Sequence, residues 1–265
     1  MAPVASLPMY DLPAVRWATD ALWSALAAAL TARGIAAPGA LDRRSAYQSV
    51  WREPGLLLSQ TCGYPYVTAL RGRVQLVATP AYRAPGCVGA RYASALIVRD
   101  GDPAASLSDL RDRRVAFNAT DSQSGHNALR AAVAPLARDG RFFAGSIATG
   151  AHRASAAAVA AGTADLCAVD CVTWALLSRH EPEAVAGLRV LGHTASAPGL
   201  PLIAGPTAPV AAIRAALAEV MADPRLADAR DALLLEGCEV LPDADYDAIL
   251  AMEREAGARG YHRLT

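Results

Sequence analysis

Apolar and amphipathic stretches alternate along this 265-residue chain. A helix is expected over about residues 13–33, because Trp17, Leu22 and Leu26 recur there with helical spacing and would form one apolar face. Gly34 follows at the position where helices commonly end. The chain is therefore expected to begin with a short strand and an amphipathic helix.

Short apolar runs predict strands that alternate with helices. Runs that are apolar without interruption, such as L-L-L at 56–58, suit strands buried on both faces, as in parallel sheets. Further strands are expected at about 55–61, 73–80, 92–101, 113–118, 144–149, 164–170 and 188–194. The C-terminal part of the chain is expected to be helical, at about 209–221, 224–236 and 244–260. This alternation predicts an α/β fold with mostly parallel sheets.

The composition narrows the class of protein. Apolar residues make up 53% of the chain and charged residues 19%, which suits a globular protein of one large domain or two small ones. The net charge of zero does not favour nucleic acid or an anionic membrane as a partner. The basic residues are all arginine, which excludes a Walker phosphate loop and a lysine Schiff base.

The N-terminal residues do not resemble a secretory leader, and no apolar stretch is long enough to cross a membrane. As written, the chain is expected to be cytoplasmic. It would be periplasmic if a leader had been removed. Insertion into a membrane is not expected.

The five cysteines are irregularly spaced and make a poor disulfide framework. Cys62 and Cys87 both lie near expected strand ends and could be neighbours, but free thiols are favoured over a bridge. Cys167 and Cys171 are four positions apart, but no second pair of cysteines or histidines is spaced to complete a zinc site with them. We therefore expect no metal and no cofactor.

The segment Thr120–Arg130, T-D-S-Q-S-G-H-N-A-L-R, lies between an expected strand and an expected helix. Ser122 and Ser124 offer hydroxyl donors, Gln123 offers an amide, and Gly125 permits close approach of a backbone. With the free N–H groups of a helix start, these residues could hold a phosphate, phosphonate or carboxylate. The same residues also suit a plain N-cap, which spacing alone slightly favours, whereas a nucleophilic serine is disfavoured because the G-x-S-x-G elbow is missing.

Other candidate residues follow expected strands. His152 begins a helix, where it could donate to an anion or be exposed. Asp170 ends a buried strand, where it could hold the amine of a ligand or cap the next helix. Gln60 and Thr61 end another strand, and Tyr10 follows the first one. Ligands of open α/β sheets bind at such strand ends, so these residues are candidate ligand contacts.

Three motifs follow one another within residues 55–205: S-x-S-G, then G-x-H, then A-D-x-x-x-x-D. In this order and spacing, the sequence resembles the phosphate/phosphonate-binding family of ABC-importer substrate-binding proteins. That family has the type II periplasmic binding fold. This sequence departs from the family pattern at Gln123, where the family often has threonine. It also departs at the N-terminus, which does not resemble a leader or a lipid anchor.

The resemblance implies roles for individual residues. The serine hydroxyls and the helix start would hold the oxyanion, the histidine would contact it, and the aspartate would face the amino end of the ligand. A tyrosine of the family hinge is also matched. The residues that take these roles here are Ser122, Gln123, Ser124, His152, Asp170 and Tyr92.

The resemblance also implies two α/β lobes that close over a ligand like a hinge. Residues 1–97 and 196–265 would form one lobe, and residues 98–195 the other. The chain would cross between the lobes near 92–98 and 194–202. Each lobe would hold a mostly parallel sheet flanked by helices.

Three functions remain open from the sequence. The first is a non-catalytic protein that binds a small anion, such as a phosphonate, phosphate or phosphorylated metabolite, with an ABC permease as partner if it is exported. The second is a cytoplasmic enzyme on the same fold, with His152 and Asp170 as acid and base. The third is a ligand-sensing subunit of a regulator. Of these, the binding protein is favoured over the enzyme.

Overall fold

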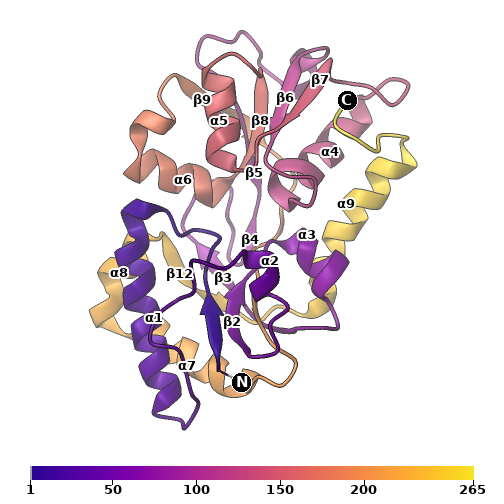
Figure 1. Ribbon diagram of the computed structural model, residues 1–265. Helices are drawn as coiled ribbons and strands as arrows, with labels where there is room; N and C mark the ends of the chain where they lie inside the picture. Colours follow the sequence, from indigo (N-terminus) through magenta and orange to yellow (C-terminus); the bar gives the residue numbers. More distant parts are fainter. Residues whose placement is uncertain (1) are drawn as a thin grey trace. The chain divides into compact units, whose positions relative to one another are not determined.

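The computed structural model describes residues 2–265 and divides into two compact units (Figure 1). Unit 1 contains the residues up to Arg83, Val88–Ala90 and Pro198–Asp245. Unit 2 contains Ala84–Cys87, Arg91–Ala197 and Tyr246–Thr265.

Tyr246–Thr265 belongs to unit 2, whereas the sequence interpretation grouped all of residues 196–265 with the N-terminal part; Pro198–Asp245 does lie in unit 1. Ala256, Tyr261 and Leu264 are buried in the same apolar cluster as Phe117 and other strand residues of unit 2. The apolar face of a helix can be seen in a sequence, but which core it covers cannot.

Unit 1 is built on a five-stranded sheet in the order β1-β2-β11-β3-β12. Its strands are β1 (Val4–Ser6), β2 (Leu56–Gln60), β3 (Gln75–Tyr82), β11 (Leu202–Ala204) and β12 (Leu235–Glu239). β1 is parallel to β2, whereas β11 is antiparallel to both β2 and β3, and β12 is antiparallel to β3. β2 is buried along its whole length, as its apolar run predicts.

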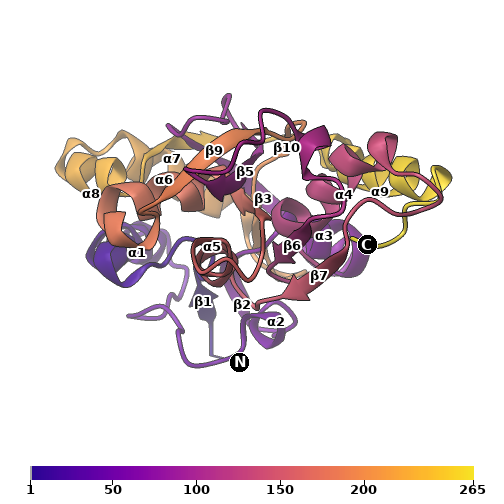
Figure 2. The ribbon, with the colours of Figure 1, turned by 90° about the horizontal axis from the view of Figure 1, so that it is seen from above.

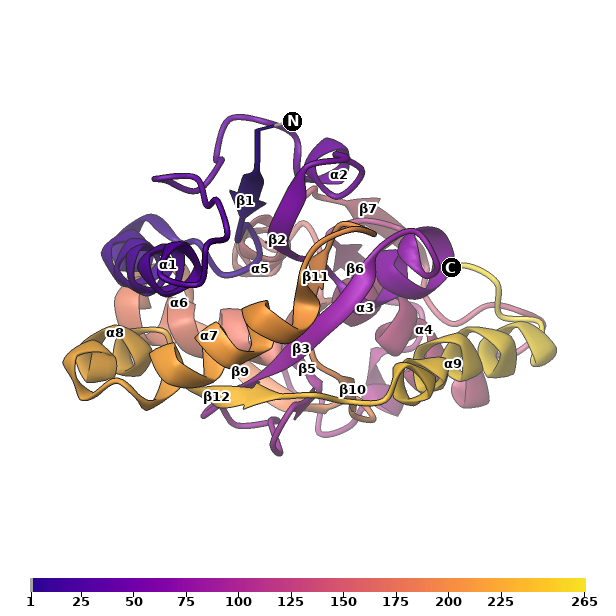
Figure 3. The ribbon, with the colours of Figure 1, turned by 90° about the horizontal axis from the view of Figure 1, so that it is seen from below.

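Helices of unit 1 cover this sheet. They are α1 (Arg16–Thr31), α2 (Tyr47–Val50), α3 (Gly63–Pro65), α7 (Val210–Ala222) and α8 (Ala227–Ala232). α1 packs beside α7 and α8 (Figure 3). The expected apolar face of α1 is wrong at Trp17, which is 54% exposed, while Trp23 is buried. Trp17 lies about 140° around the helix from Leu22, so the two cannot share one face.

The helix expected over 224–236 is also partly wrong. α8 ends at Ala232, Leu234 has a φ of +56°, and β12 follows. β12 supplies hydrogen-bond partners to one edge of β3, including a pairing of Cys238 with Pro80. The need of that edge for partners is a tertiary effect that overrides the local preference for helix.

Unit 2 contains a second five-stranded sheet, in the order β7-β6-β8-β5-β9. Its strands are β5 (Ser94–Arg99), β6 (Arg114–Phe117), β7 (Gly145–Ala148), β8 (Leu166–Asp170) and β9 (Leu188–His193). β6 is parallel to β7 and β8, whereas β5 is antiparallel to β8 and β9. The α/β class is confirmed, but both sheets are mixed rather than mostly parallel.

The antiparallel strands follow from how the chain connects. β5 is the first strand of its sheet after the chain enters unit 2 at Arg91, and β11 is the first after the chain returns to unit 1 at Pro198. Two short strands precede them, β4 (Arg91–Tyr92) and β10 (Ala197–Pro198), and these pair with each other. Each inserted strand runs against both of its neighbours.

The strands of unit 2 are buried on both faces because their alternate residues enter different cores. In β5, Ala95 and Ile97 face one apolar cluster, while Leu96 and Val98 face the other. α5 (His152–Ala160) covers the first cluster, and α4 (Ala128–Val133) and α9 (Asp247–Ala258), which lie side by side, cover the second (Figure 2). α6 (Cys171–His180) follows β8 directly. This two-sided packing holds the ends of the strands, where the candidate site lies.

Candidate functional site

The candidate residues of unit 2 lie where β6, β7 and β8 end. Since these strands are parallel, their carboxyl ends meet at one edge of the sheet. The chain after β6 leads to Ser122, the chain after β7 leads to His152, and β8 ends at Asp170. The loop before His152 is tied to the end of β6, because the Gly150 N–H donates to the Asn118 carbonyl oxygen at 2.9 Å.

We call Ser122–Asn127 the serine turn. Ser122 is the N-cap, and its Oγ accepts a hydrogen bond of 3.1 Å from the Gly125 N–H. The Asn127 N–H bonds the Ser122 carbonyl oxygen at 3.0 Å, which makes this a π-helical turn that continues into α4. All of these residues are buried. The N-cap expected from the spacing is therefore present, and it is part of a buried helix start.

Gly125 is required by close packing inside the serine turn. A Cβ at this position would overlap the Asn118 side-chain oxygen and would lie 3.1 Å from Cε1 of His152. The glycine thus lets the turn approach both the end of β6 and the start of α5.

Ser124 is held between two elements. Its Oγ lies 2.9 Å from Nε2 of His152, and its carbonyl oxygen accepts a hydrogen bond of 2.8 Å from the Ser94 hydroxyl. Ser94 begins β5 and pairs with Asp170 across the sheet. The structure therefore brings Ser122, Ser124 and His152 together, and Ser94 anchors the serine turn to the sheet.

His152 is neutral at physiological pH. The residue is partly exposed, but its ring atom Nδ1 is buried. Burial lowers the pKa of His152 to about 4, and the nearby carbonyl oxygen of Ala168 opposes this change. The neutral ring carries one hydrogen, so either Ser124 donates to Nε2 or Nε2 donates to Ser124.

Asp170 caps the next helix. Its Oδ1 accepts hydrogen bonds from the N–H groups of Val172 (2.8 Å) and Thr173 (3.1 Å), and its side chain is buried. Of the two roles that the sequence left open, the structure shows the cap.

The side chain of Gln123 contacts α9. Its Oε1 accepts a hydrogen bond of 2.8 Å from Asn127, and its Nε2 lies 3.2 Å from the sulfur of Met252 in α9. Asn127 also donates to the carbonyl oxygen of Ile249 at 3.0 Å. The amide of Gln123 is thus part of a buried network that fastens the serine turn to α9, a packing role that its position in the motif does not show.

The remaining predicted residues are divided between the units. Tyr92 is buried in unit 2, whereas Tyr10, Gln60 and Thr61 are buried in unit 1. Tyr10 packs edge-to-face against Tyr82, with ring centroids 5.0 Å apart. Gln60 donates through Nε2 to the carbonyl oxygen of Leu200 at 3.2 Å.

An apolar pocket of about 80 Å³ lies within unit 1. Tyr10, Gln60 and Tyr82 contribute to its lining, together with apolar residues of α1 and α7. Two of the predicted ligand residues of unit 1 therefore border a largely apolar space.

Three contributors to the site were not predicted: Ser94, Asn118 and Asn127. Ser94 is a polar residue in the otherwise apolar strand A-S-A-L-I-V, and this interruption was a usable signal. Asn118 and Asn127 flank the serine motif, but their contacts involve other elements and depend on the fold.

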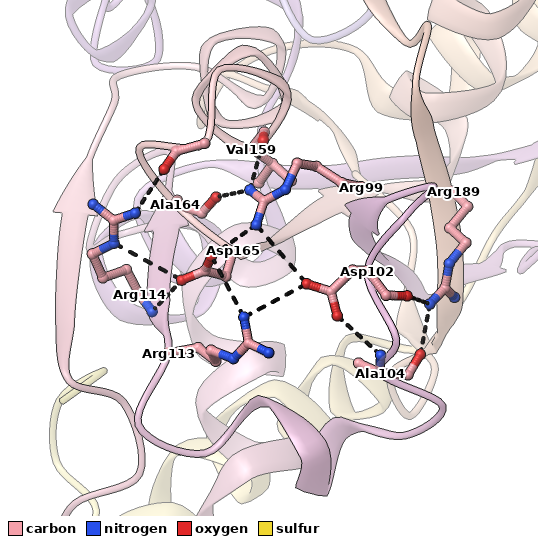
Figure 4. A network of polar contacts seen from close by, with 10 residues as sticks. Arg99, Asp102, Ala104, Arg113, Arg114, Val159, Ala164, Asp165 and Arg189 are labelled. Carbon is pink, nitrogen blue, oxygen red and sulfur yellow. Dashed lines mark hydrogen bonds and ion pairs between the residues drawn. The ribbon is translucent and has the colours of Figure 1, made fainter.

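The opposite edge of the same sheet is highly charged (Figure 4). Asp165, just before β8, accepts a hydrogen bond of 2.9 Å from Nη2 of Arg99 and another of 2.9 Å from the Arg114 backbone N–H. Burial acts to raise the pKa of Asp165, but these bonds and the arginine charges lower it below its ordinary value. We call the set the arginine–aspartate network; it consists of Arg99, Asp102, Arg113, Arg114, Asp165 and Arg189.

None of the helices formed by residues 2–265 has both the length and the apolar character needed to cross a membrane. Within the same residues, no group of three histidine, cysteine or acidic side chains is arranged to hold a metal ion.

Solved structures of other proteins share this fold. A Xanthomonas citri protein bound to chloride superposes with a TM-score of 0.73 and 17% identity, covering 98% of this chain and 99% of that one. A binding protein component of an ABC phosphonate transporter from Pseudomonas aeruginosa superposes with a TM-score of 0.73 and 16% identity, covering 98% of this chain and 88% of that one. PhnD1 from Prochlorococcus marinus, in complex with methylphosphonate, superposes with a TM-score of 0.74 and 14% identity, covering 97% of this chain and 98% of that one. At these identities the likeness establishes the fold of periplasmic binding proteins.

No curated protein sequence matches the chain. A protein family does match, over residues 58–246, and its description is ABC transporter, phosphonate, periplasmic substrate-binding protein. This match spans more than half of the chain and includes the serine turn, His152 and Asp170. The chain therefore belongs to the family of periplasmic phosphonate-binding proteins of ABC transporters.

Proposed function

We propose that unit 2 binds the oxyanion group of a small ligand at the serine turn. The observation that carries this proposal is the convergence of Ser122, Ser124 and His152 at a buried helix start, with Ser124 Oγ 2.9 Å from His152 Nε2. A helix start favours negative charge, because its first N–H groups are not used within the helix.

The proposed donors are uncharged. The Ser122 Oγ accepts from the Gly125 N–H, which leaves the Ser122 hydroxyl hydrogen to donate to an anion. When His152 Nε2 carries the ring hydrogen and donates to the Ser124 Oγ, the Ser124 hydroxyl can donate as well. His152 would thus act through Ser124 and set the direction of its hydroxyl group.

We propose a phosphonate or a phosphate ester as the ligand class. The family match supports this choice, and PhnD1 of Prochlorococcus marinus, which has the same fold, was solved with methylphosphonate.

Isothermal titration calorimetry with methylphosphonate, propylphosphonate and inorganic phosphate tests the proposal. Ser124→Ala should weaken phosphonate binding about 10- to 100-fold, because a hydrogen bond to a charged group is worth about 1.5–3 kcal/mol. The matched control is Ser178→Ala, which removes an exposed hydroxyl from α6 and should leave the affinity unchanged. Equal affinity of Ser124→Ala and the unaltered protein would contradict the proposal, as would the absence of heat with all three anions.

We further propose an ABC permease as the partner and a periplasmic location, both supported by the family match. Stimulation of the ATPase activity of a reconstituted transporter by the liganded protein would test the partnership. The enzyme alternative receives no support from the contacts, because Asp170 caps α6 while His152 bonds Ser124.

A further inference from the structure

Two cysteines of unit 2 meet side by side. The sulfur atoms of Cys87 and Cys171 lie 3.4 Å apart. The sequence interpretation considered Cys62 as the neighbour of Cys87, but in unit 2 that position is taken by Cys171. Among residues 2–265, no disulfide joins these or the other cysteines.

A tight turn presents Cys87 to its neighbour. In A-P-G-C, the Cys87 N–H donates to the Ala84 carbonyl oxygen at 2.9 Å, and Gly86 has a φ of +102°. Proline followed by a glycine of positive φ is the arrangement of a type II turn. A Cβ on Gly86 would lie only 3.1 Å from the Cys171 Cβ, so glycine allows the turn to pack directly against Cys171.

Cys171 is fixed by the sheet. It follows β8 directly, and its N–H donates to the carbonyl oxygen of Ala93 at 3.2 Å, just beyond the pairing of Ser94 with Asp170. Cys171 is buried, whereas Cys87 is partly exposed. One sulfur is therefore held rigidly in the fold, and the other is held against it by a turn that a reagent can reach.

We propose that Cys87 and Cys171 are a redox pair that closes to a disulfide. The oxidant would be another disulfide, either of a small thiol or of a thiol–disulfide oxidoreductase. The Cys87 thiolate attacks it and forms a mixed disulfide, which releases one thiol. The Cys171 thiolate then attacks the Cys87 sulfur and releases the second thiol. The two cysteines lose two electrons and two protons in total, and the oxidant is reduced to two thiols.

The disulfide would join positions 84 residues apart. The closed loop would contain the serine turn and His152, and it would end at the residue that follows Asp170. Oxidation would thus restrain the part of unit 2 that carries the candidate site. The contact with Cys87, burial and the charge of Asp170 all raise the pKa of Cys171, so its thiolate is scarce and its attack on the mixed disulfide is slow.

The test is a redox titration of the whole protein in glutathione buffers, from fully reduced to fully oxidised. Remaining thiols are blocked with N-ethylmaleimide, and peptides are identified by mass spectrometry. The proposal expects a linked peptide containing Cys87 and Cys171, and an increase in melting temperature of about 5–10 °C on oxidation, since long loops gain most from closure.

Two variants make the test specific. Cys87→Ser should abolish both the linked peptide and the redox-dependent change in melting temperature. Cys62→Ser, the matched control, should retain both. The proposal is overturned if all five cysteines remain labelled in oxidised buffer, if Cys87 links to a cysteine other than Cys171, or if Cys87→Ser keeps the full shift in melting temperature. These outcomes are independent of ligand binding, so they test the redox pair separately from the proposed function.

Discussion

The two edges of the sheet in unit 2 carry very different chemistry. At the edge where β6, β7 and β8 end, the serine turn and His152 meet through uncharged hydrogen bonds. At the opposite edge, the arginine–aspartate network surrounds Asp102 and Asp165 with arginine side chains (Figure 4). The same strands connect the two edges, because Asp165 and Asp170 lie at the two ends of β8.

Under the proposed function, the two edges of this sheet separate stability from binding. Strong charge pairs at the proposed binding edge would compete with an anion or repel it, whereas hydroxyl and N–H groups can donate to it without a counterion of their own. At the other edge, charge pairs hold the ends of β5, β6 and β8 together. We therefore expect substitutions at the two edges to change different properties.

The largest expected effect is a loss of stability at low pH that arises from histidines at one edge and not from the carboxylates at the other. Burial lowers the pKa of His152 to about 4, and burial together with the charge of Arg130 lowers that of His126 to about 4. Below pH 6.5 the unfolded chain takes up protons at these histidines, whereas the folded protein does not. The free energy of unfolding therefore decreases as the pH is lowered. From pH 7 to pH 5, the free energy of unfolding should decrease by about 2 kcal/mol for each histidine.

Urea denaturation at half-unit pH intervals measures this loss. His152→Gln should remove about half of the decrease between pH 7 and pH 5. Asp165→Asn should leave that decrease unchanged, because the pKa of Asp165 is lowered and its contribution is lost only below the ordinary carboxyl pKa of about 4. An unaltered pH dependence in His152→Gln would mean that His152 does not contribute to this effect.

The second prediction tests the network directly. Asp165→Ala leaves the Arg114 N–H without its acceptor and removes the partner of Arg99, so the free energy of unfolding should fall by about 3 kcal/mol. The affinity of the folded protein for methylphosphonate should stay within about twofold. The exposed Asp100 provides the control, and Asp100→Ala should change stability by less than about 0.5 kcal/mol. A large loss of affinity in Asp165→Ala would show that the two edges are coupled.

The third prediction concerns the support of the serine turn. Asn127→Ala removes buried hydrogen bonds to Gln123 and Ile249, and should cost about 2 kcal/mol of stability while also weakening ligand binding. Gln123→Met keeps a long side chain toward Met252 and should cost less than half as much. Chemical denaturation and calorimetry on both variants check this. Weaker binding without a loss of stability in Asn127→Ala would argue for direct ligand contact instead.

The smallest effect is expected within the network itself. Arg113 lies 3.8 Å from Asp102 and 4.0 Å from Asp165 and is partly exposed, so Arg113→Ala should change stability by only about 0.5 kcal/mol. Thermal denaturation at low and high salt measures this small contribution. A loss as large as that of Asp165→Ala would mean that long-range charge, rather than the hydrogen bonds at 2.9 Å, holds this edge.

Much of the fold was predictable because its signals are local. The buried run of β2 and the motif T-D-S-Q-S-G-H at the start of a helix were recognised from neighbouring residues alone. The helical turn at Leu107–Leu110 is equally local, because it is closed by a capping box between Ser106 and Asp109. Burial, capping and periodicity depend on residues a few positions apart.

Other features could not be predicted because they depend on contacts between distant segments. β12 forms because β3 has an edge to pair, and α9 joins unit 2 because its apolar residues complete that core. The side chain of Gln123 turns toward Met252, which lies 129 positions away in the sequence. None of these choices has a local signal.

The sequence by itself determined most of the strands and helices and the place of the serine motif at a strand-to-helix junction. It also carried the succession of motifs that identified the family. Only the tertiary structure decided that Ser124 meets His152, that Cys87 meets Cys171, and that Asp170 caps a helix. The reason is physical: a helix cap or a buried strand is stabilised by its own neighbours, whereas the partner of a side chain is set by which strands become adjacent in the sheet.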